Sequence, residues 1–189
     1  MNKILKIGLL ELAYLAIFIL GGTSGLIHPM CYAYVGALLP LLFALVYLPT
    51  ACIIQKFGAA TVLNGFLLVL FWIAGEADIS LVVGLVLLTA IAEVVRFVCG
   101  YTNIKGIRWS FIPFALSFFA YTAHWWTDTE GSLAAAVAEM PAGYDAMMKP
   151  VIDNTPALIA VILLAIPVAI VSIRIAEKLM KKQIEKLKK

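Results

Sequence analysis

The 189 residues of this chain are 63% hydrophobic and only 13% charged, and their mean hydropathy is +1.02. A water-soluble domain is typically about 45–50% apolar and about 25% charged. The composition therefore excludes an ordinary soluble globule and predicts a membrane protein whose solvent is lipid. The net charge of +3 is small, and no long basic run with interleaved aromatic residues occurs, so nucleic-acid binding is not expected.

Six apolar segments approach the roughly 17–25 residues that a helix needs to cross a hydrocarbon core of about 30 Å. We therefore expect an all-α protein with six transmembrane helices in a single domain over residues 1–189. Pro40 inside the second segment and Pro49 at its end predict a kinked or tilted helix, and the third segment is short. The segments are Ile4–Leu20, Cys31–Leu48, Ala59–Ala74, Ile79–Val98, Trp109–Trp126 and Pro156–Ile173.

The positive charges indicate the orientation, because Lys and Arg accumulate on the cytoplasmic side of short loops. With both termini in the cytoplasm, 13 of the 14 cations lie inside and only Lys149 lies outside. Residues 174–189 then form a basic cytoplasmic tail. The cytoplasmic cations are Lys3, Lys6, Lys56, Arg96, Lys105, Arg108, Arg174, Lys178, Lys181, Lys182, Lys186, Lys188 and Lys189. The predicted outer loops hold Glu76, Asp78, Asp128, Glu130, Glu139, Asp145 and Asp153.

The predicted outer segment over residues 127–155 is too long to be a simple connection. Loops of more than about 12–15 residues in compact domains are commonly lids or binding loops. We expect this segment to fold into short helices. Two interpretations remain open, a lid over a binding site and an amphipathic helix that lies on the outer leaflet.

Motifs for the common hydrolytic chemistries do not occur in the sequence. There is no GxxxxGK[ST], HExxH, GxSxG or paired-cysteine motif. Glu93-Val-Val-Arg96 is distantly similar to a motif of intramembrane peptidases, but the second adjacent glutamate and the histidine pair are missing. The widely spaced Cys31, Cys52 and Cys99 are expected to be small buried apolar residues. We expect no enzyme activity, no catalytic residue, no metal site and no intrinsic cofactor.

Two carboxylates and one amide lie inside apolar segments. An ionised group at mid-membrane costs about 2.5–3.5 kcal/mol on insertion scales. Arg96 follows Glu93 by three residues on one helical face, which predicts a structural ion pair. Glu11 has no such cation, and it pairs with another helix, accepts a proton or meets a partner subunit. Asn64 is expected to form an interhelical hydrogen bond.

Both histidines and several aromatic residues fall at the predicted outer ends of the segments. His28 lies in the outer loop Gly21–Pro29, and His124 closes the fifth segment. Tryptophans at such ends form interfacial belts or line ligand sites, and both readings apply here. The candidate substrate-binding residues are His28, Tyr32, Tyr121, His124, Trp125 and Trp126.

Several features together make the chain resemble the Trep_Strep integral membrane family over nearly its whole length. They are a basic N-terminus leading into Ile7-Gly8, the inner loop Lys56-Phe57-Gly58-Ala59, an acidic outer turn after the third helix, and Ala142-Gly143-Tyr144 followed by a final helix with a Lys-rich end. That family is grouped with candidate substrate-binding S components of energy-coupling factor (ECF) transporters. The resemblance implies a six-helix bundle in the bacterial cytoplasmic membrane.

The resemblance also implies a function and partners. An S component captures a scarce micronutrient outside and joins a transmembrane coupling subunit and two ATPases, which agrees with the missing P-loop. A planar, vitamin-like substrate would suit Tyr32, Tyr121, Trp125 and Trp126. Haem as a substrate would additionally use His28 and His124 as iron ligands.

S components commonly dock through small residues spaced as AxxxA on the first helix, because small side chains let a partner helix approach closely. This chain lacks that spacing on its first helix. We therefore take the small residues Gly8, Ala13 and Ala16 of that helix as the candidates for docking. Two other functions remain open. One is a stand-alone secondary carrier or channel, and the other is a structural or regulatory membrane subunit without a ligand.

Overall fold

The computed structural model describes residues 2–185, and these form a helical bundle without a β-strand. Met1 and residues 186–189, which include Lys186, Lys188 and Lys189 of the predicted basic tail, lie outside the described residues. The α-helices are α1 (Lys3–Thr23), α2 (Pro29–Tyr34), α3 (Pro40–Ile53), α4 (Ala59–Ala74), α5 (Ile79–Cys99), α6 (Ile104–Ala115), α7 (Ser117–Thr122), α8 (His124–Thr127), α9 (Thr129–Glu139), α10 (Tyr144–Asp153), α11 (Thr155–Leu179) and α12 (Lys181–Glu185). Two short 3-10 helices, η1 (Ser24–Leu26) and η2 (Val35–Ala37), link α1, α2 and α3.

The second predicted segment bends, as its proline indicates. It consists of Pro29–Ala37 and Pro40–Ile53, which meet at an angle of 44°. Pro40 supplies no N–H to continue the preceding hydrogen bonds, and it occupies the first turn of a new helix, where that N–H is not needed. Pro49, which we expected at the end of the helix, lies inside α3 instead.

The fifth predicted segment, Trp109–Trp126, is not one helix. It begins earlier, at Ile104, and is divided into α6, α7 and α8. The first break follows Pro113, which removes one backbone hydrogen bond from the last turn of α6. Leu116 instead closes a tighter turn onto the Pro113 carbonyl at 3.2 Å. The expectation of a continuous fifth helix was therefore wrong.

The helices long and apolar enough to span a membrane are Lys3–Leu26, Ile79–Cys99 and Thr155–Leu179, and the bent pair α2 and α3 would add a fourth span. The 16 residues of α4 match the third predicted segment. At about 1.5 Å per residue they reach about 24 Å, short of a hydrocarbon core of about 30 Å. Several apolar helices are thus present, while six crossings remain a prediction.

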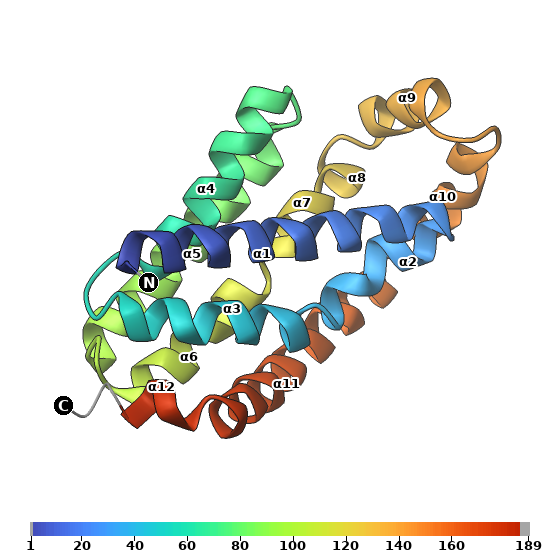
Figure 1. Cartoon of the computed structure of the whole chain (residues 1–189). Helices are drawn as coiled ribbons and strands as arrows, with labels where there is room; N and C mark the ends of the chain where they lie inside the picture. The colour runs from blue at the N-terminus through green and yellow to red at the C-terminus, as the bar shows by residue number, and fades with distance from the viewer. Residues whose placement is uncertain (1, 186–189) are drawn as a thin grey trace.

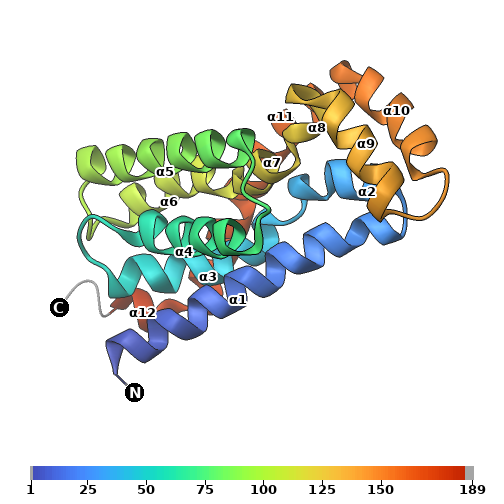
Figure 2. The ribbon, with the colours of Figure 1, turned by 90° about the horizontal axis from the view of Figure 1, so that it is seen from above.

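The two ends of the bundle differ in what they hold. The start of α1 and α12 lie at one end, and α9 and α10 lie at the opposite end (Figures 1 and 2). The outer segment that we expected to fold is this second end, because residues 127–155 contain α9 and α10.

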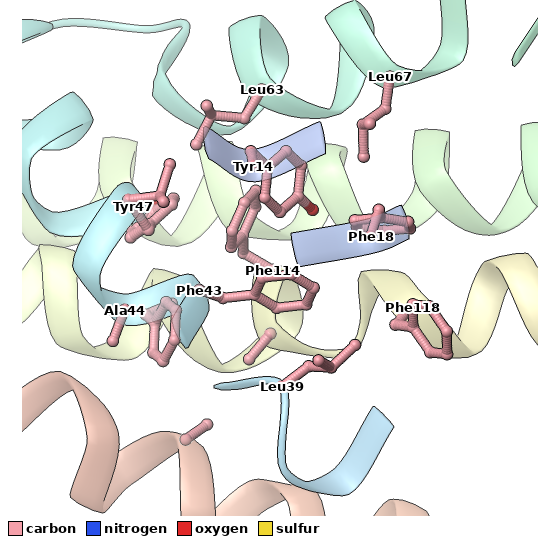
Figure 3. Close-up of a cluster of buried hydrophobic side chains, with 14 of the residues drawn as sticks. Tyr14, Phe18, Leu39, Phe43, Ala44, Tyr47, Leu63, Leu67, Phe114 and Phe118 are labelled. Carbon is pink, nitrogen blue, oxygen red and sulfur yellow. The ribbon is translucent and has the colours of Figure 1, made fainter. Parts of the chain in front are cut away.

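Aromatic side chains fill the centre of the bundle (Figure 3). The ring of Tyr14 on α1 lies 5.0 Å from that of Phe43 on α3 and 5.2 Å from that of Phe114 on α6. Phe18 packs 5.4 Å from Phe118 on α7. Aromatic pairs at these separations favour one fixed arrangement of the helices over looser ones.

Asn64 on α4 joins four helices. Its Oδ1 accepts from the Tyr14 hydroxyl at 2.8 Å, and its Nδ2 donates to Thr89 Oγ1 at 2.8 Å and to Ser117 Oγ at 3.1 Å. These partners lie on α1, α5 and α7. The interhelical hydrogen bond expected of Asn64 is confirmed.

Glu93 and Arg96 do not form the expected ion pair, although both are buried on α5. Glu93 Oε1 accepts from the backbone N–H of Ala60 at 2.8 Å and of Thr61 at 3.3 Å, at the start of α4. The Arg96 guanidinium donates to four backbone carbonyls, those of Ala51, Ile54, Lys56 and Tyr101. A helix end offers each charge a better partner, because unpaired N–H groups begin α4 and unpaired C=O groups end α3.

The cysteines also depart from expectation, which placed them in the apolar interior. Cys31 is exposed, and Cys52 and Cys99 are partly exposed. Cys52 nevertheless packs against the hydrophobic core, so an apolar sequence context meant partial burial at two of the three positions and exposure at Cys31.

Candidate functional site

The α9 cavity is a hollow of about 370 Å³ that runs along the length of α9. Its walls come from α2, the α4–α5 turn, α7, α8 and α9. Its volume lies at the lower end of the roughly 300–1,000 Å³ typical of small-molecule sites. The lining residues are Tyr32, Gly75, Glu76, Ala77, Asp78, Tyr121, His124, Trp125, Asp128, Gly131, Ser132, Ala135, Ala136, Glu139 and Met140.

Local hydrogen bonds hold α8 and α9 around the cavity. Asp128 caps α9, since its Oδ1 accepts from the Gly131 N–H at 3.2 Å. His124 Nδ1 lies 2.8 Å from Ser132 Oγ, and the same hydroxyl donates to the His124 carbonyl at 3.1 Å. The two contacts fix both the imidazole and the turn between the helices.

Three aromatic residues from separate helices form the inner wall. The Tyr32 ring meets Tyr121 at 5.9 Å and Trp125 at 6.3 Å, both edge to face. The His124 ring lies 4.9 Å from that of Trp125. Tyr32 and Trp125 are buried in this cluster, and the partly exposed ring of Tyr121 is a flat, polarisable surface against which a small organic molecule can pack.

Two polar atoms at or behind this wall, Trp125 Nε1 and the Tyr144 hydroxyl, are buried without a hydrogen-bond partner among residues 2–185. Trp125, which lines the cavity, is only 3% exposed. Tyr144 packs behind it on α10, with the rings 6.4 Å apart, and its burial raises the pKa of the phenol. A buried N–H without an acceptor costs free energy.

Four carboxylates surround the cavity, and its lining contains no Lys or Arg. Asp78 and Asp128 cap helices. Asp78 Oδ1 accepts from the Leu81 N–H at 2.8 Å and from the Ser80 hydroxyl. Glu76 and Glu139 are exposed, and neither side chain bonds to any part of the chain that the structure describes. The cavity is therefore negatively charged.

The structure brings together four of the six candidate substrate-binding residues, Tyr32, Tyr121, His124 and Trp125. The other two do not line the cavity. Trp126 Nε1 donates to the Ile152 carbonyl at 3.2 Å and thereby ties α8 to α10. His28 is exposed and caps α2, because its Nδ1 accepts from the Met30 N–H at 3.1 Å. The histidines thus do not face a common cavity, and nothing in this geometry favours haem ligation by both.

Sequence reasoning missed the acidic residues and Ser132 as parts of the site. It placed Glu76, Asp78, Asp128 and Glu139 in outer loops, where they indicated only orientation. Their meeting depends on how packing places α9 relative to the α4–α5 turn, and the spacing along the chain carries no signal for that.

The small residues proposed for docking lie on an open part of α1. Ala13 and Ala16 are exposed, and a Cβ at Gly8 would meet no other atom within 4 Å. Leu9 and Leu12 on the same helix are also exposed. This surface is free within the described chain and accessible to lipid or to another helix.

A second hollow of about 290 Å³ lies between α4 and α5. Its wall is mostly apolar and includes Leu68, Leu85 and Val86. Two polar atoms there, Thr61 Oγ1 and Glu93 Oε2, are buried without a partner. The hollow lies among residues of the apolar helices, so it differs in character from the acidic α9 cavity.

Comparison with known proteins gives one match. No curated protein and no solved structure matches the chain. The model of the family described as hypothetical bacterial integral membrane protein (Trep_Strep) matches residues 1–186, nearly the full length. The chain, with its several apolar helices, therefore belongs to this family of bacterial integral membrane proteins.

Proposed function

We propose that this protein is the substrate-binding subunit of an ECF-type importer in the bacterial cytoplasmic membrane. It captures a scarce organic micronutrient outside the cell, and separate subunits drive its delivery inward. The observation that carries the proposal is the α9 cavity, in which residues from five parts of the chain form one aromatic and acidic recess. Concave sites with aromatic walls and a few polar groups are the usual form of small-molecule sites.

The polarity of the bundle supports the outward orientation. The cavity lies at the end with α9, and the basic helix ends lie at the opposite end (Figure 2). With the basic end in the cytoplasm, the cavity opens to the outside. The α9–α10 segment then serves as the lid, and Trp126 holds it through the Ile152 carbonyl.

Partner subunits supply the energy in this proposal. The chain contains no phosphate-binding P-loop, so a transmembrane coupling subunit and two cytoplasmic ATPases would perform the hydrolysis. The exposed small residues Gly8, Ala13 and Ala16 on α1 suit close approach of a helix of the coupling subunit.

Mass spectrometry of small molecules retained by gently purified protein, followed by uptake assays in vesicles, tests the proposal. We expect one retained organic molecule and uptake only when the coupling subunit and the ATPases are present. Uptake by the chain alone would instead show a self-sufficient carrier or channel. The absence of any retained molecule and of any uptake would favour a ligand-free subunit.

A matched pair of variants ties binding to the α9 cavity. Ala134 and Ala135 are adjacent exposed residues of α9, and only Ala135 lines the cavity. Ala135→Trp should therefore abolish ligand retention, whereas Ala134→Trp should leave it unchanged. Equal retention by both variants would place the ligand elsewhere.

A further inference from the structure

We infer that the α9 cavity selects an organic cation with a flat body and a hydrogen-bond acceptor. The inference rests on the proposed function, which it narrows to a class of substrate. It combines three separate features of the cavity, namely its charge, its aromatic wall and its unpaired donor.

The first feature is an uncompensated negative charge. Four carboxylates line the cavity, and no Lys or Arg side chain faces them within the lining. A cleft lined by one sign of charge concentrates ligands of the opposite sign and repels ligands of the same sign. An anionic nutrient would meet four carboxylates here without any cation to balance its charge.

The carboxylates divide into two pairs with different roles. Asp78 and Asp128 accept hydrogen bonds from the backbone at the starts of α5 and α9, so part of their charge stabilises the fold. Glu76 and Glu139 make no such bond with residues 2–185, and both line the cavity. These two glutamates are the ones free to bind a cationic group.

The second feature is the wall of Tyr32, Tyr121 and Trp125. Tyr121 is the least buried of the three, and a cation placed over its ring is attracted by the negative face of the π system. The same ring surface packs against a planar apolar body. Carboxylates together with aromatic rings therefore favour an aromatic or quaternary ammonium cation over a small metal ion, for which the described residues offer no cluster of three or more ligands.

The third feature is independent of the carboxylates. Trp125 is 97% buried, since only 3% of it is exposed, and its Nε1 donor has no partner in the part of the chain that the structure describes. A donor cannot bind the cationic group itself. A ligand that displaces part of the wall burying this donor would meet it with an acceptor, such as a carbonyl oxygen, elsewhere on the same molecule. The carboxylates require a positive charge and the Trp125 donor requires an acceptor. The expected ligand therefore has a positive charge at one end and a hydrogen-bond acceptor at the other.

A series of three small molecules tests this inference. The cation 1-methylnicotinamide, uncharged nicotinamide and anionic nicotinate share one flat ring and a carbonyl oxygen, and they differ in charge. We expect full-length protein in nanodiscs to bind the cation at least about tenfold more tightly than nicotinamide, by quenching of tryptophan fluorescence, and to show the weakest binding for nicotinate. Raising the salt concentration should weaken only the binding of the cation.

Matched variants assign the effect to the cavity. Glu76→Gln with Glu139→Gln should reduce the affinity for 1-methylnicotinamide about tenfold and leave that for nicotinamide unchanged. The control removes two charges outside the lining, Glu130→Gln with Asp153→Asn, and should have no effect. Trp125→Phe removes the donor and keeps an aromatic ring. It should lower the affinity for every probe that binds the natural sequence.

The results separate this inference from the proposed function. Equal binding of the three probes, no binding of any of them, or an equal loss in the control variant would overturn selection of a cation. A retained natural ligand that is neutral or anionic would also overturn it, while uptake dependent on the ATPases would still support the importer. Failure of that uptake would overturn the importer and not the cation site.

Discussion

Glu93 and Arg96 lie one turn apart on α5, and they bind to the start of α4 and to the end of α3, respectively. The carboxylate accepts from the first N–H groups of α4, and the guanidinium donates to carbonyls at the end of α3. Between these ends lies Gly58, with φ of 121°, in the turn Lys56-Phe57-Gly58-Ala59. The pair thus holds the α3–α4 turn against α5 through the backbone, and each charge complements the dipole of the helix end that it meets.

Replacement of Arg96 should destabilise the protein strongly. Arg96→Ala leaves four buried or partly buried carbonyls without their donor. We expect a loss of about 3 kcal/mol in the free energy of unfolding, measured by denaturation in detergent. Arg174→Ala, at an exposed position on α11, serves as the control and should change stability little.

Replacement of Glu93 separates the hydrogen bonds from the charge. Glu93→Gln keeps an acceptor for Ala60 and Thr61 and removes the negative charge at the start of α4, which should cost about 1 kcal/mol. Glu93→Ala removes both and should cost more. Hydrogen exchange at the Ala60 and Thr61 amides should accelerate only in the alanine variant. Equal exchange in both variants would contradict the observed contacts.

Two tyrosines with different hydroxyl environments should respond oppositely to removal of the hydroxyl group. The Tyr47 hydroxyl lies 2.7 Å from Ser110 Oγ, whereas the Tyr144 hydroxyl is buried and has no partner among the described residues. Tyr47→Phe should therefore lower the free energy of unfolding by about 1 kcal/mol, and Tyr144→Phe should leave it equal or raise it. Destabilisation by Tyr144→Phe would show that this hydroxyl has a hydrogen-bond partner in the membrane-embedded protein.

Loss of the Trp126 indole donor should loosen α10 selectively. Trp126→Phe keeps the ring and removes the 3.2 Å hydrogen bond to the Ile152 carbonyl. We expect faster hydrogen exchange in residues 144–153, because the free energy of local opening there should fall by about 1 kcal/mol. Exchange in α5 should change little. Trp72→Phe, which alters an exposed tryptophan on α4, is the matched control.

The pKa of Tyr144 predicts a dependence of stability on pH. Burial raises this pKa above the ordinary 10.0, so the folded protein favours the neutral phenol. The resulting stabilisation is complete below pH 10 and is lost as the pH rises through the folded-state value. Thermal unfolding between pH 9 and pH 12 should show a smaller decline for Tyr144→Phe than for the natural sequence.

Amino-acid order alone determined the apolar helices and the two different ends of the bundle. Apolar runs long enough to cross lipid are local features, so α4 lies where the sequence predicts it and α1, α5 and α11 differ from their segments mainly in length. The bend before Pro40 is also local, because proline has no N–H to continue the backbone hydrogen bonds of a helix. Asn64 could be identified as an interhelical residue since a lone amide in an apolar helix needs a partner.

The tertiary structure decided which groups meet across the chain. Spacing on one helix predicted that Glu93 would bind Arg96, but packing of α3 and α4 against α5 presented helix ends whose unpaired backbone groups bind each charge. Likewise, the α4–α5 turn and α9 contribute acidic residues to one cavity, although Glu76 and Glu139 are 63 positions apart in the sequence. Helix formation depends on neighbours within a few residues, whereas such contacts depend on how whole helices pack.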